Sequence, residues 1–253
     1  MGELDPHVWD RFDMVAVQDW TGYQARQPLL WSELEWAGLL DRAEWHWNFP
    51  TPVTDAFVRT ISIDRGTIRG EGAFSCTMGH YRIIKTARER GVKNLLVMED
   101  DVCFAKDAGF IEAAVGALPD DYDFAKLEWY PVAPVSRDEV AARDRAGGFW
   151  ASAHGIVAHG TAAVAFSARG MDWKLGLMEK AAKASPFDGT PLRSIDRYDE
   201  PGYLPTDLRA YVAVPCVAVQ RPHGVGDPHM HAGAKNYNKF LLRNDLSVYT
   251  RGV

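Results

Sequence analysis

The sequence is poor in cysteine, and its cysteines lack the spacings that build disulfide frameworks or zinc sites. The 253 residues include three cysteines, Cys76, Cys103 and Cys216, and none of them forms a C-x-x-C pair. An odd number without paired spacing favours neither a disulfide framework nor a zinc site. We therefore expect buried free thiols.

Long hydrophobic runs and excess positive charge are also missing. No stretch approaches the roughly 20 apolar residues of a membrane-spanning helix. The opening segment, MGELDPHVWDRFD, is acidic where a secretory signal would be basic and then hydrophobic. The net charge of -6 argues against a broad nucleic-acid footprint. We expect a cytoplasmic protein with no membrane span and no nucleic-acid partner.

What is present is enough apolar material for a large core. Hydrophobic residues make up 47% of the chain and aromatic residues 11%, which suits a folded α/β protein of this length. No internal repeat, low-complexity tract or linker divides the sequence. We therefore predict one domain over residues 1–253.

Residues 94–104, NLLVMEDDVCF, are the centre of the functional prediction. Four apolar residues run into Glu99, Asp100 and Asp101, a pattern typical of a strand buried on both faces in a parallel sheet. Ligands of such sheets bind at the carboxyl ends of the strands. In an extended segment Glu99 and Asp101 share a face, so this E-x-D pair could hold one divalent ion. The alternative interpretation is a solvated acidic turn.

The remaining pattern predicts alternating strands and helices. Residues 12–17 read as a first strand, and residues 41–52 as an ordered loop in which Trp45 and Trp47 either pack or stack on a sugar. Residues 131–148 are polar and punctuated by proline, which favours a mobile loop or lid. Strands are also expected over residues 122–129, 155–167 and 208–220, and helices over residues 29–40, 80–91, 110–118 and 171–184.

The run GAFSCTMGHYRIIKTARERGVKNLLVMEDDVCF, residues 72–104, closely resembles the hallmark segment of glycosyltransferase family 25, the lipopolysaccharide and collagen β-galactosyltransferase group. Weaker echoes extend to residue 227, and Gly79 and Gly226 replace serines of the family pattern. The first strand is followed by QDWT instead of an Asn-Leu-Asp-Arg type segment. The residues that carry the resemblance are Gly72, Ala73, Cys76, His80, Glu99, Asp100, Asp101, Pro215, Gln220 and Asp227.

This resemblance implies a GT-A-like, Rossmann-like α/β fold with a mostly parallel sheet flanked by helices. It also implies transfer of a hexose, with galactose or glucose as leading candidates, from a UDP-sugar to an acceptor hydroxyl with inversion. The cofactor would be Mn²⁺ or Mg²⁺, and the acceptor a saccharide, a peptide or a small molecule. The implied donor contacts are Gly72, His80, Asp100 and Gln220, and the implied metal ligands are Glu99, Asp101, Asp227 and His229.

Inversion requires a base that deprotonates the acceptor hydroxyl, and two aspartates are candidates. Asp196 lies between Arg193 and Arg197 in sequence, which favours a paired carboxylate and a weaker base. Asp207 precedes an apolar run, where partial burial would raise its pKa. We favour Asp207 as the base and keep Asp196 as the alternative.

Three other classes of protein share parts of the pattern. A receiver-type signalling domain would also follow a strand with acidic residues, but Glu99 and Glu128 lie too close together in sequence for its two acidic strands. A nucleotidyltransferase would usually show a glycine-rich basic loop after the first strand, whereas QDWTGYQARQ has one glycine and one arginine. A non-catalytic nucleotide-sugar-binding protein of the same scaffold also remains open.

Overall fold

The structure is a computed structural model. It describes residues 4–20, 26–48, 71–131, 145–156, 158–183, 195 and 204–221.

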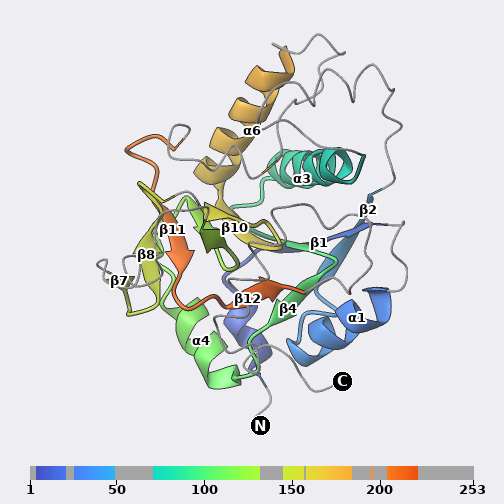
Figure 1. Ribbon diagram of the computed structural model, residues 1–253, viewed down its shortest axis with the longest axis vertical. Helices are drawn as coiled ribbons and strands as arrows, with labels where there is room; N and C mark the ends of the chain where they lie inside the picture. Colours follow the sequence, from blue (N-terminus) through green and yellow to red (C-terminus); the bar gives the residue numbers. More distant parts are fainter. Residues whose placement is uncertain are drawn as a thin grey trace.

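A mixed sheet of eight strands forms the centre of the protein (Figure 1). Strands β1, β2 and β3 are parallel, β10 is antiparallel to both β3 and β5, and β11 is again parallel to β5. Only β10 and β8 therefore run against the other described strands of this sheet. The order is β2 (Ala43–Asn48), β1 (Met14–Trp20), β3 (Asn94–Glu99), β10 (Ala163–Ser167), β5 (Phe124–Lys126), β11 (Ala210–Ala213), β8 (Trp150–Ser152) and β7 (Arg145–Ala146).

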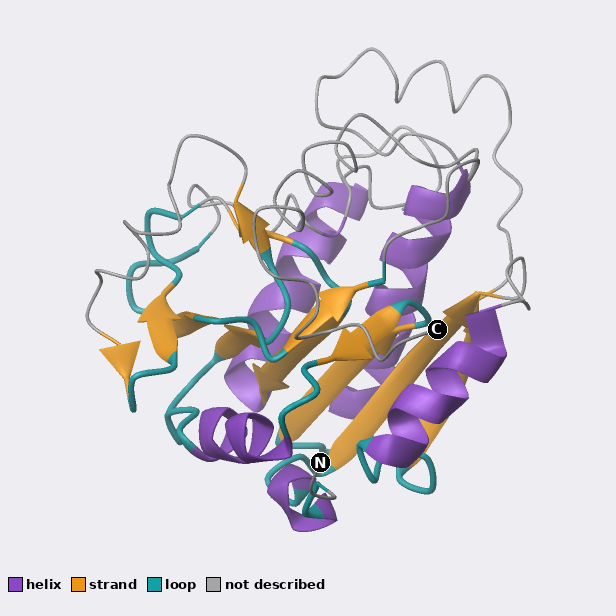
Figure 2. Ribbon diagram, turned by 60° about the horizontal axis from the view of Figure 1, so that its bottom comes forward, coloured by secondary structure: helices purple, strands orange, loops and turns teal. Residues whose placement is uncertain are grey.

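Helices cover both faces of the sheet, as Figures 1 and 2 show. The long helices α3 (Glu71–Glu89) and α6 (Ala168–Lys183) pack against each other on one face. The helices α1 (Gln27–Trp36), α4 (Ala108–Gly116) and η1 (Pro6–Trp9) lie on the other face. Two small sheets complete the described part, β12 (Ala218–Gln220) with β4 (Val102–Phe104), and β6 (Tyr130–Pro131) with β9 (Ala158–His159). The expected α/β class, a mostly parallel sheet flanked by helices, is confirmed.

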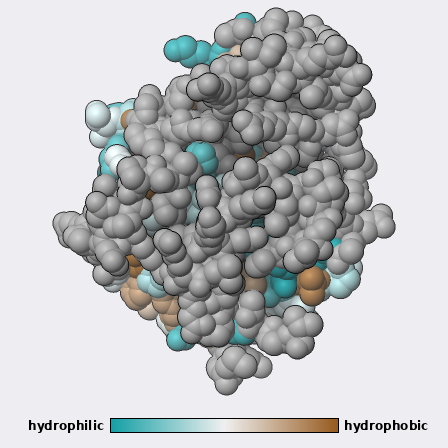
Figure 3. Space-filling view, viewed as in Figure 1, coloured by the Kyte–Doolittle hydropathy of each residue, from teal (hydrophilic) through white to brown (hydrophobic). Residues whose placement is uncertain are grey.

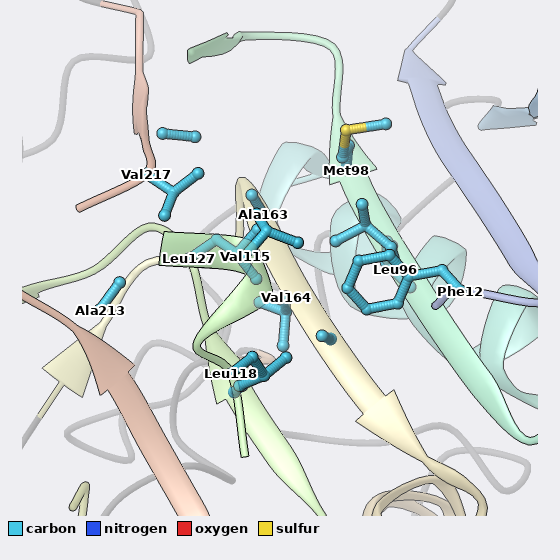
Figure 4. Packing of buried hydrophobic residues seen from close by; sticks show 14 of the residues in the cluster. Phe12, Leu96, Met98, Val115, Leu118, Leu127, Ala163, Val164, Ala213 and Val217 are labelled. Carbon is cyan, nitrogen blue, oxygen red and sulfur yellow. The ribbon is translucent and has the colours of Figure 1, made fainter. Parts of the chain in front are cut away.

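The core follows from the apolar runs of the central strands. Residues 95–98 of β3 are fully buried, as a strand covered by helices on both faces requires. Figure 4 shows Phe12 beside Leu96, and Val164 of the neighbouring β10 close to Leu118. The packed strands hold the residues that follow β3 in a fixed position.

Several boundaries differ from the sequence prediction. The loop expected over residues 41–52 contains the edge strand β2, in which Trp45 and Trp47 alternate with polar residues. The strand expected over residues 122–129 is regular only in β5. The run at residues 208–220 divides into β11 and β12, which belong to different sheets, with Pro215 between them. Proline cannot donate a hydrogen bond to a strand ladder, which is consistent with the break at Pro215.

The predicted lid lies mostly outside the described residues. Pro131 belongs to β6, residues 145 and 146 form β7, and both Gly147 and Gly148 have positive φ angles of 57° and 79°. Whether residues 131–148 close over a ligand stays a prediction.

None of the described helices combines the length and the apolar character that a transmembrane helix needs. On the face shown in Figure 3, the described surface mixes hydrophilic and hydrophobic residues. Hydrophobic surface appears at the lower right, where Figure 1 places α1, and Leu29 and Trp31 of that helix are exposed.

Candidate functional site

The carboxyl ends of β1 and β3 lie side by side where the chain connections change direction. In the sheet, β1 lies between β2 and β3 and is parallel to both. The helix α1, which follows β1 and leads to β2, covers one face of the sheet, and α3, which precedes β3, covers the opposite face. Ligands of open α/β sheets bind outside the carboxyl ends of the strands at such a switch point. Gln18 of β1 is level with Glu99 of β3. The acidic triplet therefore lies where this architecture places a ligand.

Asp100 and Asp101 face one guanidinium group. β3 ends at Glu99, and these two aspartates form the turn that leads into β4. Arg26 Nη1, at the start of α1, lies 3.1 Å from Asp100 Oδ1 and 3.4 Å from Asp101 Oδ2. Both aspartates are buried, so each contact is strengthened by the low local dielectric. Among the described residues, the positive charge of Arg26 thus faces two carboxyl groups.

Strand β12 fixes Asp101 from a second direction. Gln220 Nε2 donates to Asp101 Oδ2 over 2.8 Å, and the backbone N–H of Arg221 donates to the carbonyl oxygen of Asp101 over 2.6 Å. β12 is held there because it pairs with β4, with Gln220 opposite Val102. The structure therefore brings Gln220, expected at the donor site, to the acidic triplet.

Burial makes both carboxyl groups reluctant to ionise. It raises the pKa of Asp100 to about 6 against the opposing charge of Arg26, with smaller increases from Glu99 and Asp19. Burial, followed by the charges of Glu99 and Asp100, raises the pKa of Asp101 well above its usual range. A further cation at this position would stabilise both carboxylates.

Asp19 at the end of β1 adds a fully buried carboxyl group. Gln27 Nε2 donates to Asp19 Oδ2 over 2.9 Å, and burial raises the pKa of Asp19 despite that bond. Within the described part of the chain, Asp19 Oδ1 and Asp100 Oδ2 are buried without a hydrogen-bond partner. Buried polar atoms are rarely left unsatisfied, and carboxylate oxygens are the usual ligands of Mg²⁺. These residues therefore fit a hard divalent cation.

Glu99 turns toward α3 and toward the segment before β10. Its Oε1 accepts from Thr161 Oγ1 at 2.5 Å, from His80 Nε2 at 3.0 Å and from Cys76 Sγ at 3.4 Å. Burial raises the pKa of Glu99, but the hydrogen bonds from these three side chains and the charge of His80 outweigh it, so the pKa of Glu99 is lowered. His80, expected as a donor contact, reaches the triplet through Glu99.

The expected pairing of Glu99 with Asp101 on one face does not match these contacts. Extended conformation ends at Glu99, so the alternation of a strand does not continue through Asp100 and Asp101. The two aspartates share Arg26, whereas Glu99 is bonded to side chains of α3 and to Thr161.

A close approach of α3 to β1 places Cys76 and His80 near Glu99. At Gly79, a Cβ atom would lie 2.4 Å from Oε1 of Gln18, which is closer than real Cβ contacts come. Glycine at this position therefore leaves room for the side chain of Gln18 between the helix and β1. The expected donor residue Gly72 lies in the first turn of the same helix.

Other expected residues lie apart from this cluster or outside the described residues. Asp196, Asp227 and His229 are not among the described residues. Asp207 precedes β11, and Arg169 bridges it to Asp123 at the amino end of β5. Because β5 and β11 run in the direction of β3, Asp207 lies at the sheet edge opposite the acidic triplet.

The location of Asp207, at the opposite end of the strands from the acidic triplet, leads to a test of its predicted role as the base. Its side chain is 75% exposed, and ion pairs of this kind contribute little to stability. We expect Asp207→Asn to change transfer by less than roughly twofold, because a group at the opposite edge of the sheet does not contact the acceptor. Initial rates on the purified variant check this. A hundredfold loss with unchanged folding would restore Asp207 as the base.

Two further tryptophans, Trp129 and Trp150, belong to the core and are not available to stack on a sugar. Trp129 and Trp150 are buried, and their indole N–H groups donate to the carbonyl oxygens of Ala213 and Ala114, each over 2.7 Å. Trp47 on the edge strand is 50% exposed.

The sequence interpretation missed the residues that complete the cluster, which are Asp19, Arg26, Gln27 and Thr161. Asp19 had a usable signal, because it follows the apolar run of the first strand and strand ends carry ligands. Thr161 and Arg26 lack a local signal, since their partners are distant in sequence.

No protein-family model and no curated protein matches the chain. Among solved structures, the chain is similar to a mannose-1-phosphate geranyltransferase from Thermus thermophilus, with 16% identity and a TM-score of 0.40 over 82% of this chain and 74% of that chain. This likeness is too distant to assign a function. Membership of glycosyltransferase family 25 stays a prediction, and the proposals below rest on the geometry of the site.

Proposed function

We propose that this protein is a divalent-metal-dependent glycosyltransferase that moves a hexose, with galactose or glucose as the leading candidates, from a UDP-sugar to an acceptor hydroxyl. The observation that carries the proposal is the pair of buried aspartates, Asp100 and Asp101, which face the guanidinium group of Arg26 at the switch point of the sheet. The resemblance of residues 72–104 to family 25 supports the same activity.

The described residues around Asp100 and Asp101 could bind a cation that contacts the diphosphate of the UDP-sugar. Asp100 and Asp101 would hold Mn²⁺ or Mg²⁺, with the buried Asp19 adding a nearby carboxylate, and Asp227 and His229 are further proposed ligands. Such an ion stabilises the negative charge that accumulates on a diphosphate leaving group. Arg26 supplies planar donors that suit phosphate oxygens, and Gln220 holds Asp101 in place.

Asp196 becomes the leading base for the acceptor hydroxyl. The residue before it, Ile195, is fixed to the helix that borders the triplet, because its N–H donates to Thr77 Oγ1 over 3.1 Å. Lys174 Nζ of α6 donates to the carbonyl oxygen of Ile195 over 3.1 Å. Thr77 follows Cys76 on α3, so these bonds hold Ile195 on the same side of the sheet as the Glu99 cluster, and its neighbour Asp196, which lies outside the described residues, is proposed as the base on that ground.

Thermal unfolding with and without metal tests the proposal. The pKa of Asp100 is raised from 3.8 to about 6, so the folded state binds its proton more tightly than the unfolded state, and stability without metal falls as pH rises through this window. We expect Mn²⁺ to raise Tm clearly at pH 7.5 and to lose this effect below about pH 6, where protons occupy the carboxyl groups.

The same Tm measurements are then repeated with UDP, in the presence and absence of Mn²⁺. UDP should raise Tm further only when Mn²⁺ is present, because the ion links the diphosphate to the carboxylates. A UDP effect of equal size in excess chelator would contradict the proposal. Incubation with a UDP-sugar then separates the alternatives, since glycosyl transfer releases UDP whereas a nucleotidyltransferase makes or consumes pyrophosphate.

A further inference from the structure

Cys76, His80 and Glu99 form a compact group of three different metal-ligating side chains. Cys76 and His80 are four residues apart on α3, so they lie on the same face of the helix, and Glu99 ends the strand beneath them. One ligand atom from each lies within 4.8 Å of the other two. His80 is 1% exposed.

The side chains of two possible metal ligands converge on one oxygen of Glu99. Three donors, from Thr161, His80 and Cys76, approach this one oxygen. A carboxylate oxygen has about two lone-pair positions, and three donors share this one. A cation bound by the sulfur, the imidazole nitrogen and the carboxylate oxygen would replace two of these hydrogen bonds with metal bonds.

The distances suit a tetrahedral ion. With Zn–N and Zn–O bonds near 2.0–2.1 Å, two such ligand atoms lie about 3.3 Å apart, and a sulfur with a bond near 2.3 Å lies about 3.6 Å from the oxygen. In the structure His80 Nε2 is 3.0 Å and Cys76 Sγ is 3.4 Å from Glu99 Oε1. Movements of a few tenths of an ångström therefore bring these two pairs to the spacing of a tetrahedral ion, whose fourth ligand would be a water molecule.

We propose that Cys76, His80 and Glu99 bind a zinc-type divalent ion at a site separate from the Asp100–Asp101 pair. A thiolate and an imidazole favour Zn²⁺ over Mn²⁺ and Mg²⁺, which prefer the all-oxygen ligands of the aspartates. On binding, the thiol of Cys76 releases one proton to solvent and its sulfur bonds to the metal. The dipositive ion is then neutralised by one thiolate and one carboxylate, which suits a largely enclosed site where His80 is buried and the other two ligands are half-buried.

The bound ion would fasten α3 to the end of β3. It would also keep Glu99 directed away from Asp101, so the two cation sites use different carboxylates. The spacing of the cysteines gave no zinc prediction, because two of the three ligands come from one helical turn and the third from a strand 19 residues beyond His80.

Cobalt spectroscopy of the full-length protein tests the assignment, with Co²⁺ alone as the probe. We expect the near-ultraviolet thiolate-to-cobalt band and the intense visible bands of four-coordinate cobalt at one equivalent, with Zn²⁺ displacing both. Cys76→Ser should remove the thiolate band, and His80→Asn should weaken Co²⁺ binding at least tenfold. Cys103→Ser and Cys216→Ser are the matched controls, because these cysteines lie elsewhere in the core and should leave the spectrum unchanged.

Two variants separate this site from the proposed donor site. Asp101→Asn should keep the thiolate band and the rise in Tm with Zn²⁺, even where the effect of Mn²⁺ and UDP is lost. Cys76→Ala, which provides a second variant if the serine form does not fold, should lose the Zn²⁺ effect and keep the Mn²⁺ effect. A protein without a thiolate band, or with a band that survives loss of Cys76, would overturn the assignment whatever the outcome for UDP.

Discussion

Asp101→Asn is expected to abolish metal-dependent UDP binding and to lower glycosyl transfer by roughly a hundredfold or more. The substitution removes a charge that the cation requires and keeps the size of the side chain. Asparagine retains a side-chain carbonyl oxygen that can accept the hydrogen bond from Gln220 Nε2, which lies 2.8 Å from Asp101 Oδ2 in the parent protein. Titration calorimetry with UDP in the presence of Mn²⁺, followed by initial-rate measurements, checks both parts.

The same variant should be at least as stable as the parent when no metal is present. Burial raises the pKa of Asp101 well above its usual range, so a neutral amide replaces a carboxyl group that resists ionisation. Increased Tm with lost activity distinguishes a ligand from a residue needed for folding. Asp120→Asn is the control, because the side chain of Asp120 is fully exposed and its contact with Arg11 is 3.4 Å long. Undiminished Mn²⁺-dependent UDP binding in Asp101→Asn would remove Asp101 from the metal site.

The central part of the fold could be predicted because its signal is local. An uninterrupted apolar run defines a strand that is covered on both faces, and residues 95–98 are buried as expected. The carboxylates after that run mark the carboxyl end of the strand without any knowledge of the rest of the chain. The location of the candidate site was therefore accessible from the sequence.

The direction of each carboxylate was not accessible in the same way. Strand periodicity assigns Glu99 and Asp101 to one face, but a turn begins at Asp100 and ends that periodicity. The side chains are then oriented by partners distant in sequence, Thr161 for Glu99 and Gln220 for Asp101. Such partners become neighbours only through the sheet order, which no local pattern specifies.

The edge strand β2 was missed for a different reason. Its residues, AEWHWN, alternate aromatic and polar side chains but contain no long aliphatic run, and they are followed by prolines that are typical of loops. Pairing with β1 supplies the hydrogen bonds that make this segment a strand. Tertiary context thus decided an assignment that local composition left ambiguous.

The helix α6 contains a pair of glycines that tests the packing of the fold. A Cβ atom at Gly170 would lie 1.7 Å from the backbone carbonyl oxygen of Asp123, which also accepts from the N–H of Ser167. Ser167 directly precedes α6, so moving either the carbonyl group of Asp123 or the start of α6 would disturb the hydrogen bond between Ser167 and Asp123. At Gly176 of the same helix, no described atom beyond the neighbouring residues and the backbone of the helix itself lies within 4 Å of an added Cβ atom.

Gly170→Ala is therefore expected to destabilise the protein by at least about 3 kcal/mol, because the added methyl group forces α6 away from the start of β5. For a chain of this size that corresponds to a fall in Tm of roughly 10 °C. Gly176→Ala should instead stabilise by up to about 1 kcal/mol, since alanine favours the helix and the site is open. Thermal and urea unfolding of the two variants measure the difference. Because α6 packs on α3, Gly170→Ala should also weaken the cobalt spectrum of the Cys76 site, whereas equal stability of the two variants would show that α6 does not approach Asp123 this closely.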